Sequence, residues 1–345
     1  MSEYDEVNSC APVSIVFCAY NEAQVIEKKI QNLVEIISVD KNVEVLAFCD
    51  GSSDSTWELM EKYASKIKVF RSVERQGKSY GMNFLLEQAK GEVVVFTDAN
   101  VLLDKGVPAV ARSCLSDPGI GCACGALTYI NETESPTAKA GSLYWKLEEA
   151  IKKYETEIGS TMGADGSIFA IKKRLFRTIP VDIIDDMFTS LSILIDGYRV
   201  VRCPQLKATE KMAVSTDDEF KRKIRIACRS FNCHRLLWKS IRKSFSTLNL
   251  YKYICHKLIR WFTAPILISA IFLGFVFSML ELGWEITSVI LLCAIGLVSI
   301  SWKLNLHILN IVLEIIVAFV ATFAGVIMSL NGKKYSIWEI AKSSR

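Results

Sequence analysis

Two apolar runs in the first hundred residues of the chain each end in an aspartate. The run 43–49 ends at Asp50, and the run 93–97 ends at Asp98. Near-continuous apolar runs of this length are typical of buried parallel strands, and open parallel sheets bind ligands beyond the carboxyl ends of their strands. The two carboxylates therefore predict one crevice that holds a polar ligand and a cation.

The elements that position these aspartates alternate between strand and helix. We expect strands at 13–19, 43–49, 67–70 and 92–97, and helices at 22–38, 54–64 and 78–89. This alternation predicts an α/β domain with a parallel sheet and right-handed crossovers. The first strand lacks a following Gly-x-Gly-x-x-Gly and the chain lacks a Gly-Lys-Ser/Thr loop, which counts against a dinucleotide oxidoreductase and a P-loop NTPase.

The second half of this domain has a less regular pattern. We expect a strand at 120–127, an amphipathic helix at 142–157, a glycine-rich stretch at 163–170, a helix opening at Asp185-Asp186, a strand after Gly197 and a helix at 217–238. Helix N-termini favour acids, so one interpretation of the acidic pair is an ordinary helix start.

The last third of the chain is dominated by apolar residues. Three segments, 258–280, 284–302 and 308–330, are each long enough to span a bilayer as a helix. The stretch 221–260 holds twelve Lys or Arg and neither Asp nor Glu, which is typical of a cytoplasmic juxtamembrane segment. We therefore expect an integral protein of the cytoplasmic membrane with a cytosolic N-terminal domain, and we favour this over a nucleic-acid-binding patch. Glu314 in the third segment is open to a functional role or to pairing inside a helix bundle.

These patterns divide the chain into four expected parts. They are a soluble domain at 1–230, basic amphipathic interface helices at 231–257, about three transmembrane helices at 258–330 and a tail at 331–345. The eleven cysteines have no paired metal-site spacing, which fits a reducing cytosol.

Six short motifs in a fixed order carry a family resemblance. They are Ala19-Tyr20-Asn21-Glu22, Asp50 in Asp-Gly-Ser-Ser-Asp, Gly77-Lys78 with Asn83, Asp98-Ala99-Asn100, Ile184-Asp185-Asp186, and Arg222 with Arg225. In this set the chain resembles membrane-bound family 2 glycosyltransferases with the GT-A fold, and among them the bacterial polysaccharide synthases. The resemblance spans about residues 13–260 and implies an α/β GT-A domain followed by transmembrane helices.

The resemblance implies a binding site for a UDP-sugar donor. The residues at 19–22, with Asp50, Lys78 and Asn83, match positions that contact the nucleotide. A carboxylate accepts the ring N–H of uracil, and a lysine at a helix N-terminus suits a phosphate. The alternatives are an ordinary Asp-Gly turn at Asp50 and a plain exposed lysine at Lys78.

Asp98 and Asn100 occupy the position of the family's metal-binding Asp-x-Asp. Oxygen ligands there suit Mg²⁺ or Mn²⁺, which neutralises charge on the departing diphosphate. Asparagine replaces the second acid, and its carbonyl oxygen is an uncharged ligand. The alternative for Asp98 is a helix cap.

The remaining motifs match catalytic positions of the family. Asp186 would be the general base that takes a proton from the acceptor hydroxyl, with Asp185 orienting it. Arg222 and Arg225 would pair with the diphosphate, although Ile226 replaces the tryptophan that follows in processive synthases. Asp165 matches a loop on the acceptor side, where a sugar contact and a plain turn are equally open.

We therefore expect an inverting, metal-dependent glycosyltransferase of cell-surface polysaccharide synthesis. It would transfer a sugar from a UDP-sugar to a lipid-linked or polysaccharide acceptor at the cytoplasmic membrane face, with no nucleic-acid partner. Two alternatives stay open: a polyprenyl-phosphate glycosyltransferase, and a non-catalytic membrane subunit that binds nucleotide sugar.

Overall fold

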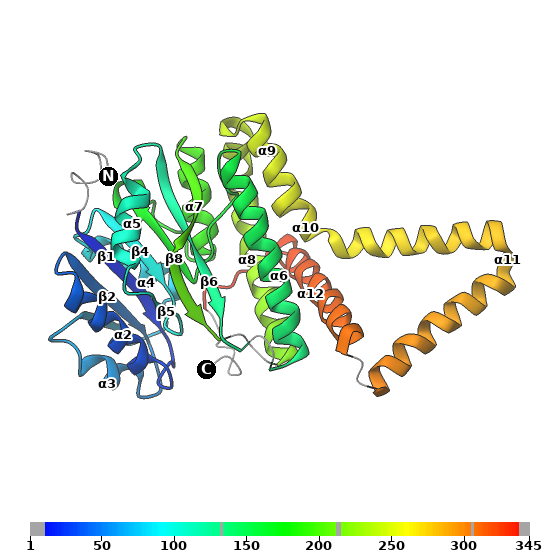
Figure 1. Cartoon of the computed structure of the whole chain (residues 1–345), viewed down its shortest axis with the longest axis horizontal. Coiled ribbons are helices and arrows are strands. Elements are labelled where there is room, and N and C mark those ends of the chain that lie inside the picture. The colour runs from blue at the N-terminus through cyan, green and yellow to red at the C-terminus, as the bar shows by residue number, and fades with distance from the viewer. Residues whose placement is uncertain (1–10, 132–133, 212–214, 305–306, 338–345) are drawn as a thin grey trace.

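The computed structural model describes residues 11–131, 134–211, 215–304 and 307–337. Its centre is an eight-stranded mixed sheet in the order β3-β2-β1-β4-β7-β6-β8-β5 (Figure 1). The strands are β1 (Val13–Ala19), β2 (Val43–Asp50), β3 (Lys68–Ser72), β4 (Val93–Thr97), β5 (Leu102–Leu103), β6 (Ile120–Tyr129), β7 (Ile168–Lys172) and β8 (Arg199–Glu210). The expected α/β fold class is confirmed.

The expectation of a wholly parallel sheet holds for one half of it. Strands β3, β2, β1 and β4 are parallel neighbours, whereas β7 runs antiparallel to both β4 and β6. The reason lies in α6 (Pro136–Glu157) and the connection after it, which return the chain to the carboxyl edge of the sheet before β7 begins. Residues just before β7 therefore lie beside residues just after β4.

Helices cover both faces of the sheet and enclose two apolar cores. One core packs side chains of α2 (Ile26–Val39), α3 (Thr56–Glu61) and α5 (Val107–Ser116) under the sheet. The other packs α4 (Lys78–Gln88), α7 (Asp185–Ile195) and α8 (Thr216–Ser244) against the opposite face. Alternate residues of the buried strands serve the two cores, as the pleat requires.

The boundary that we expected at residue 231 falls inside α8, which continues unbroken to Ser244. The apolar side chains of its last turns, Leu237 and Ile241, are buried in the protein core, so this face packs against protein. The chain then passes through α9 (Thr247–Tyr253), the π-helical turn η2 (Ile254–Leu258) and α10 (Ile259–Trp261).

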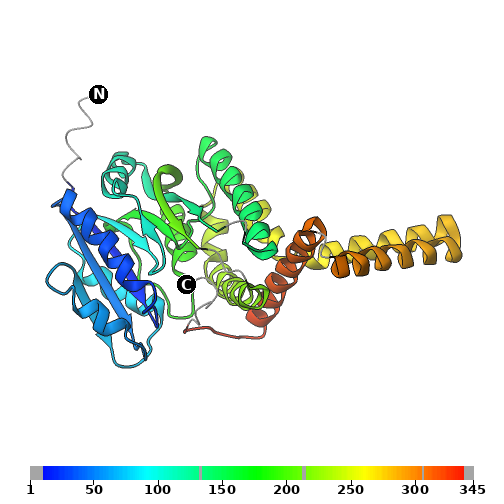
Figure 2. The ribbon, with the colours of Figure 1, turned by 60° about the horizontal axis from the view of Figure 1, so that its bottom comes forward.

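Two further helices are long and apolar enough to cross a membrane, α11 (Thr263–Leu304) and α12 (His307–Leu330). Within α11, Gly283 has φ 80° and breaks the helix, so α11 forms a V that projects away from the sheet domain (Figures 1 and 2). The first two predicted apolar segments are thus the two arms of α11, and the third lies in α12.

In contrast to α11, α12 packs on the sheet domain along α8. At Gly325 a β-carbon would lie 2.5 Å from the Ile224 carbonyl oxygen and 2.7 Å from Ala227 Cβ, so the two helices approach through this glycine. Beyond α12 the chain returns to the domain, where the Lys333 carbonyl accepts a hydrogen bond from Asn232. The expected tail is described to residue 337, and its remainder lies outside the described residues.

Candidate active site

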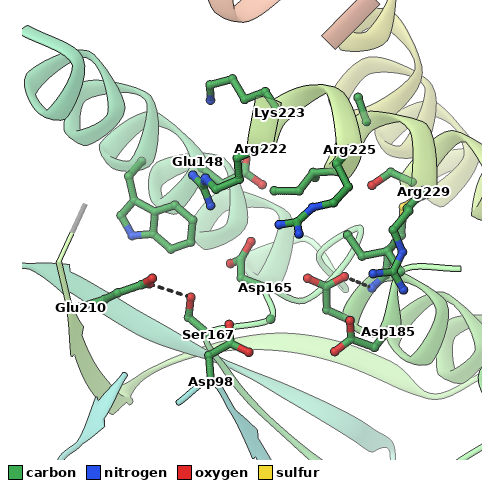
Figure 3. Close-up of a pocket in the computed structure, with 18 of the residues that line it drawn as sticks. Asp98, Glu148, Asp165, Ser167, Asp185, Glu210, Arg222, Lys223, Arg225 and Arg229 are labelled. Atoms are coloured by element: carbon green, nitrogen blue, oxygen red, sulfur yellow. Dashed lines mark hydrogen bonds between the residues drawn. The ribbon is translucent and has the colours of Figure 1, made fainter. Parts of the chain in front are cut away.

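A cavity of about 430 Å³ opens at the carboxyl edge of the sheet, between the strands and α8 (Figure 3). Several segments far apart in the sequence bring charged side chains to it, because the carboxyl ends of β4 and β8 and the loop before β7 meet at this edge. Its lining includes Asp98, Asn100, Asp165, Asp185, Asp186, Glu210, Arg222, Arg225 and Arg229. The prediction of a polar crevice at the strand ends is therefore confirmed for Asp98.

Lys78 joins two of the predicted acids. It is the first residue of α4, and its Nζ lies 2.8 Å from Asp98 Oδ1 and 3.0 Å from Asp185 Oδ2. Burial would lower its pKa, but the charges of these two carboxylates outweigh burial and raise the pKa of the ammonium. Lys78 is therefore a fixed positive charge on the cavity wall.

The two acids at the start of α7 have pKa values shifted in opposite directions. Burial acts to raise the pKa of Asp185, but the charges of Lys78 and Arg229 outweigh it and lower that pKa. Burial and then the negative charge of Asp185 raise the pKa of Asp186 to about 6. At neutral pH Asp186 is thus an ionised carboxylate of increased basicity, which suits a general base. Gly166 lets the preceding loop approach it, since a β-carbon there would lie 3.1 Å from Asp186 Oδ2.

Three arginines project from α8 toward the acids (Figure 3). Arg222 makes a two-point contact with Glu219, with Nε 2.8 Å from Oε2 and Nη2 3.1 Å from Oε1. Arg229 is buried and donates to Ser79 Oγ at 2.9 Å and to the Ile183 carbonyl. Sequence reasoning missed Arg229, although its position seven residues after Arg222 places it on the same helix face.

Asn100 is held by a residue that sequence reasoning also missed. Its Nδ2 donates to Glu210 Oε1 at 2.9 Å, and Ser167 Oγ donates to Glu210 Oε2 at 3.0 Å. Glu210 is the last residue of β8. The residues before it, 202–209, are not a continuous apolar run, so the signal that singled out Asp50 and Asp98 is absent at Glu210.

Asp165 lies on the cavity wall opposite α8, as Figure 3 shows, and forms an ion pair with Lys152 of α6. Lys152 is fully buried and also contacts Glu149 Oε1 at 3.3 Å. The Lys152 ammonium lies 4.7 Å from the centre of the Trp145 ring. Asp165 is therefore more than a turn residue, because a buried cation fixes its carboxylate at the cavity.

Asp50 and Asn83 do not line the cavity. Asp50 is fully buried, and its carboxylate accepts hydrogen bonds from the backbone N–H of Gln76 at 2.7 Å and of Gly77 at 3.1 Å. Asn83 donates to and accepts from the backbone of Ile179. In this arrangement Asp50 holds the turn that starts α4, and the expectation that Asp50 and Asn83 contact the nucleotide stays a prediction.

The predicted segment 19–22 lies at the rim and is tied to the Asp-Gly-Ser-Ser turn. Asn21 has φ 51° and its Oδ1 accepts from the Ser53 N–H at 2.8 Å. Ala19 is buried at the end of β1, and Tyr20 stacks under the Arg75 guanidinium at 3.4 Å from the ring centre. Glu22 is buried and lines the cavity.

A buried lysine supports the 98–100 segment from below. Lys29 of α2 donates to Thr97 Oγ1 at 3.1 Å and to the Val101 carbonyl at 2.5 Å, so it brackets the turn. Burial lowers its pKa to about 7. Lys29 lies among the apolar positions of the helix predicted at 22–38. That position indicates a buried lysine with a structural partner, and sequence reasoning did not use it.

An ionic network lies at the end of the cavity nearer the apolar helices. His256 of η2 contacts Glu155 Oε1 at 2.9 Å and Glu148 Oε1 at 3.0 Å, and all three are buried. Arg260 adds a contact to Glu148 Oε2 at 2.8 Å. Thr322 of α12 belongs to the cavity lining, so the cavity extends to an apolar helix.

Glu314, the acid inside the third apolar segment, faces the domain. Its Oε1 accepts from Thr216 Oγ1 at 2.6 Å and from Thr137 Oγ1 at 3.1 Å, which joins α12 to the starts of α8 and α6. Of the two interpretations left open for this residue, the structure shows pairing with neighbouring helices.

Comparison with known proteins places these features in a family. Residues 14–179 match the model of glycosyl transferase family 2. A poly-β-1,6-N-acetyl-D-glucosamine synthase of Staphylococcus aureus is 26% identical over 202 residues, which is 56% of this chain and 48% of that protein. A cholesterol galactosyltransferase of Borreliella burgdorferi is 35% identical over 91 residues, 26% of this chain and 25% of that protein. The chain thus spans half or less of the length of these curated relatives.

The fold has a similar solved structure. A mannosyltransferase from Pyrobaculum calidifontis, solved in complex with GDP-Man and Mn²⁺, aligns with a TM-score of 0.68 and 21% identity over 94% of this chain and 88% of that one. This likeness extends through the C-terminal helices. Residues 14–179 therefore form a glycosyltransferase family 2 domain, and the chain has a GT-A-like mixed α/β fold followed by two apolar helices that could cross a membrane.

Proposed function

We propose that the chain is an inverting glycosyltransferase that moves a sugar from a UDP-sugar to a lipid-linked or polysaccharide acceptor. The observation that carries this proposal is the basic carboxylate Asp186, which lines a cavity shared with the cationic groups Lys78, Arg225 and Arg229. An inverting transfer needs this combination, because one group accepts a proton while others stabilise the departing diphosphate.

In the proposed reaction the acceptor hydroxyl oxygen bonds to the anomeric carbon of the donor sugar. The bond from that carbon to the diphosphate oxygen breaks, and UDP departs with the electron pair. Asp186 takes the proton of the acceptor hydroxyl. Asp185, whose pKa is held down by Lys78 and Arg229 against the effect of burial, stays ionised beside it and keeps it basic.

The cationic groups would receive the donor's diphosphate. Lys78 stands at the N-terminus of α4, where backbone N–H groups and the helix dipole also favour an anion. The α8 arginines face it across the cavity, and a guanidinium binds phosphate oxygens in pairs. In this proposal the diphosphate lies between α4 and α8, and the sugar is directed toward Asp165 and Asp186.

The residues at 98–100 fit a divalent cation. Asp98 presents a carboxylate at the cavity with 34% of its side chain exposed, and the Asn100 amide nitrogen is turned to Glu210, so its carbonyl oxygen is the atom left for a ligand role. These are the hard oxygen donors that Mg²⁺ and Mn²⁺ bind. When bound, the cation would neutralise charge on the diphosphate. The Lys78 ammonium, which contacts Asp98, would add a second positive charge there.

The position of the cavity supports a membrane-associated acceptor. Its lining includes Trp261, which precedes α11, and Thr322 of α12, so an acceptor can reach Asp186 from the side of the apolar helices. This arrangement suits a lipid-linked acceptor at the cytoplasmic membrane face. It also keeps the polyprenyl-phosphate glycosyltransferase as a second candidate, because Lys257 and Arg260 stand at that end of the cavity.

The test is a donor and acceptor screen with the full chain in membranes. UDP-N-acetylglucosamine, other UDP-sugars and GDP-mannose are supplied in turn, with and without EDTA. Nucleotide release and product mass are then measured. A single sugar on a polyprenyl phosphate would identify the second candidate, and a glycan product the first. Absence of release with every donor, from a protein that still binds UDP, would support the non-catalytic alternative and overturn the proposal.

A further inference from the structure

The segment Asp98-Ala99-Asn100 offers a cation one acidic ligand, and the fold brings a second acid to it. Glu210 ends β8, and the short pairing of β5 with β8 sets Leu102 opposite Thr209. Continued by one position, that antiparallel register sets Val101 opposite Glu210, which brings the neighbouring Asn100 close to Glu210. The resulting contact, Asn100 Nδ2 to Glu210 Oε1, measures 2.9 Å.

Glu210 differs in its partners from most acids of the cavity and resembles Asp186, since neither makes an ion pair within the described residues. Asp98 and Asp185 contact Lys78, Asp165 contacts Lys152, and Glu219 contacts Arg222. The partners of Glu210 are the neutral amide of Asn100 and the neutral hydroxyl of Ser167. Within the part of the chain that the structure describes, no lysine, arginine or histidine forms an ion pair with it.

A carboxylate on a cavity wall that makes no ion pair is costly to ionise, and a bound cation would compensate its charge. Figure 3 shows Glu210 and Ser167 on the same side of the cavity as Asp98. The hydrogen bond from Asn100 also fixes which end of the amide turns toward Glu210, so that both residues present oxygen atoms. Asp98 and Asn100 after β4 and Glu210 at the end of β8 thus bring three oxygen-bearing side chains to the same part of the cavity lining.

We propose that Glu210 is the second anionic ligand of a divalent cation at Asp98, and that it supplies the charge that Asn100 lacks. This inference rests on the proposed function, because it concerns the cation of that same site. In this proposal the two anionic ligands come from the ends of two strands, Asp98 after β4 and Glu210 at the end of β8. An Asp-x-Asp segment would carry both in one loop.

The test uses the full chain in detergent and measures binding rather than turnover. Labelled UDP at a fixed low concentration is retained by the protein in equilibrium dialysis, and the Mn²⁺ concentration for half-maximal retention is determined. Glu210→Gln removes the charge and keeps the shape: its amide oxygen can accept from Asn100, and its amide nitrogen can donate to the Ser167 hydroxyl, which reverses that bond. We expect it to raise the Mn²⁺ requirement by about 10- to 100-fold. Glu35→Gln, a change of the same kind at an exposed ion pair with Lys105, should leave it unchanged.

A charge relocation completes the test. Asn100→Asp combined with Glu210→Gln returns the second acid to the 98–100 segment, and it should restore the Mn²⁺ requirement to within about threefold of the wild type, since ligand charge sets affinity. Restoration also shows that Glu210→Gln folds. If Asp98→Asn loses Mn²⁺-dependent retention while Glu210→Gln retains it, Glu210 is a structural clasp and the inference is wrong. If wild-type retention does not depend on Mn²⁺, the metal part of the proposed function fails as well.

Discussion

Replacement of Asp186 by asparagine tests the proton transfer most directly. The substitution keeps the size and shape of the side chain, and an amide oxygen can still accept the hydrogen bond that the carboxylate receives from the Met187 N–H. What is lost is the capacity to accept a proton at neutral pH. We therefore expect donor binding to be retained and transfer to be lost.

The magnitude follows from the pKa of about 6. At pH 7.5 about 97% of Asp186 would be ionised and at pH 5 about 9%, so wild-type kcat should fall about tenfold between these values. A positioned general base contributes about 10²- to 10⁴-fold, or about 3–5 kcal/mol of transition-state stabilisation. Asp186→Asn should lower kcat by that factor at pH 7.5 and should flatten the acid limb of the pH profile.

The assay is UDP release across pH 5–8, with the dissociation constant for UDP measured in parallel. Asp185→Asn is the informative companion, because the charge of Asp185 helps to raise the pKa of Asp186. Its removal should move the acid limb of the remaining activity to lower pH. An Asp186→Asn enzyme with more than a tenth of wild-type kcat, or one that keeps the acid limb, would refute the assignment of the base.

Three further predictions concern stability. Gly325→Leu should separate α12 from α8 and cost about 1–3 kcal/mol, seen as a lower melting temperature in detergent, whereas Gly274→Leu, with nothing within 4 Å, should not. His256→Ala removes the hydrogen-bond partner that two buried carboxylates share, although each keeps other partners, and should cost about 1–3 kcal/mol in the same assay. Lys29 has a folded-state pKa of about 7, below that of an unfolded lysine, so the unfolded state binds more protons between pH 7 and 10. Wild-type stability should therefore rise with pH over this range relative to Lys29→Met, and parallel melting curves would contradict this.

Much of the fold could be predicted from local sequence pattern. The runs that end at Asp50 and Asp98 are β2 and β4, and the helix expected at 78–89 is α4 within one residue. The antiparallel course of β7 could not be predicted, because strand direction depends on where α6 returns the chain and not on the residues of β7. The length of α8 was missed because its basic surface masked an apolar face that packs in the core.

The residues of the candidate site that could be predicted are those that a short local motif identifies without knowledge of the tertiary contacts. Asp98, Asp185 and Asp186 lie together, and Lys78 links two of them as an ion pair. Asp50 shows the limit of such reasoning: its strand-end position is as expected, yet its carboxylate is used by backbone N–H groups of the next turn. Glu210 could not be assigned to the site from local sequence, because its contact with Asn100 depends on a strand pairing between residues 110 positions apart.

The contact between α12 and α8 has a practical consequence for anyone who wishes to study the enzyme as a soluble fragment. Hydropathy suggests cutting the chain before Thr263, where the apolar helices begin. Such a cut would remove the helix that covers Ala227 and Cys228 on α8 and the acid that pairs with Thr216. The fragment would present a new apolar strip on the helix that carries the arginines, so poor solubility of the fragment would be a consequence of its architecture and not of its expression host.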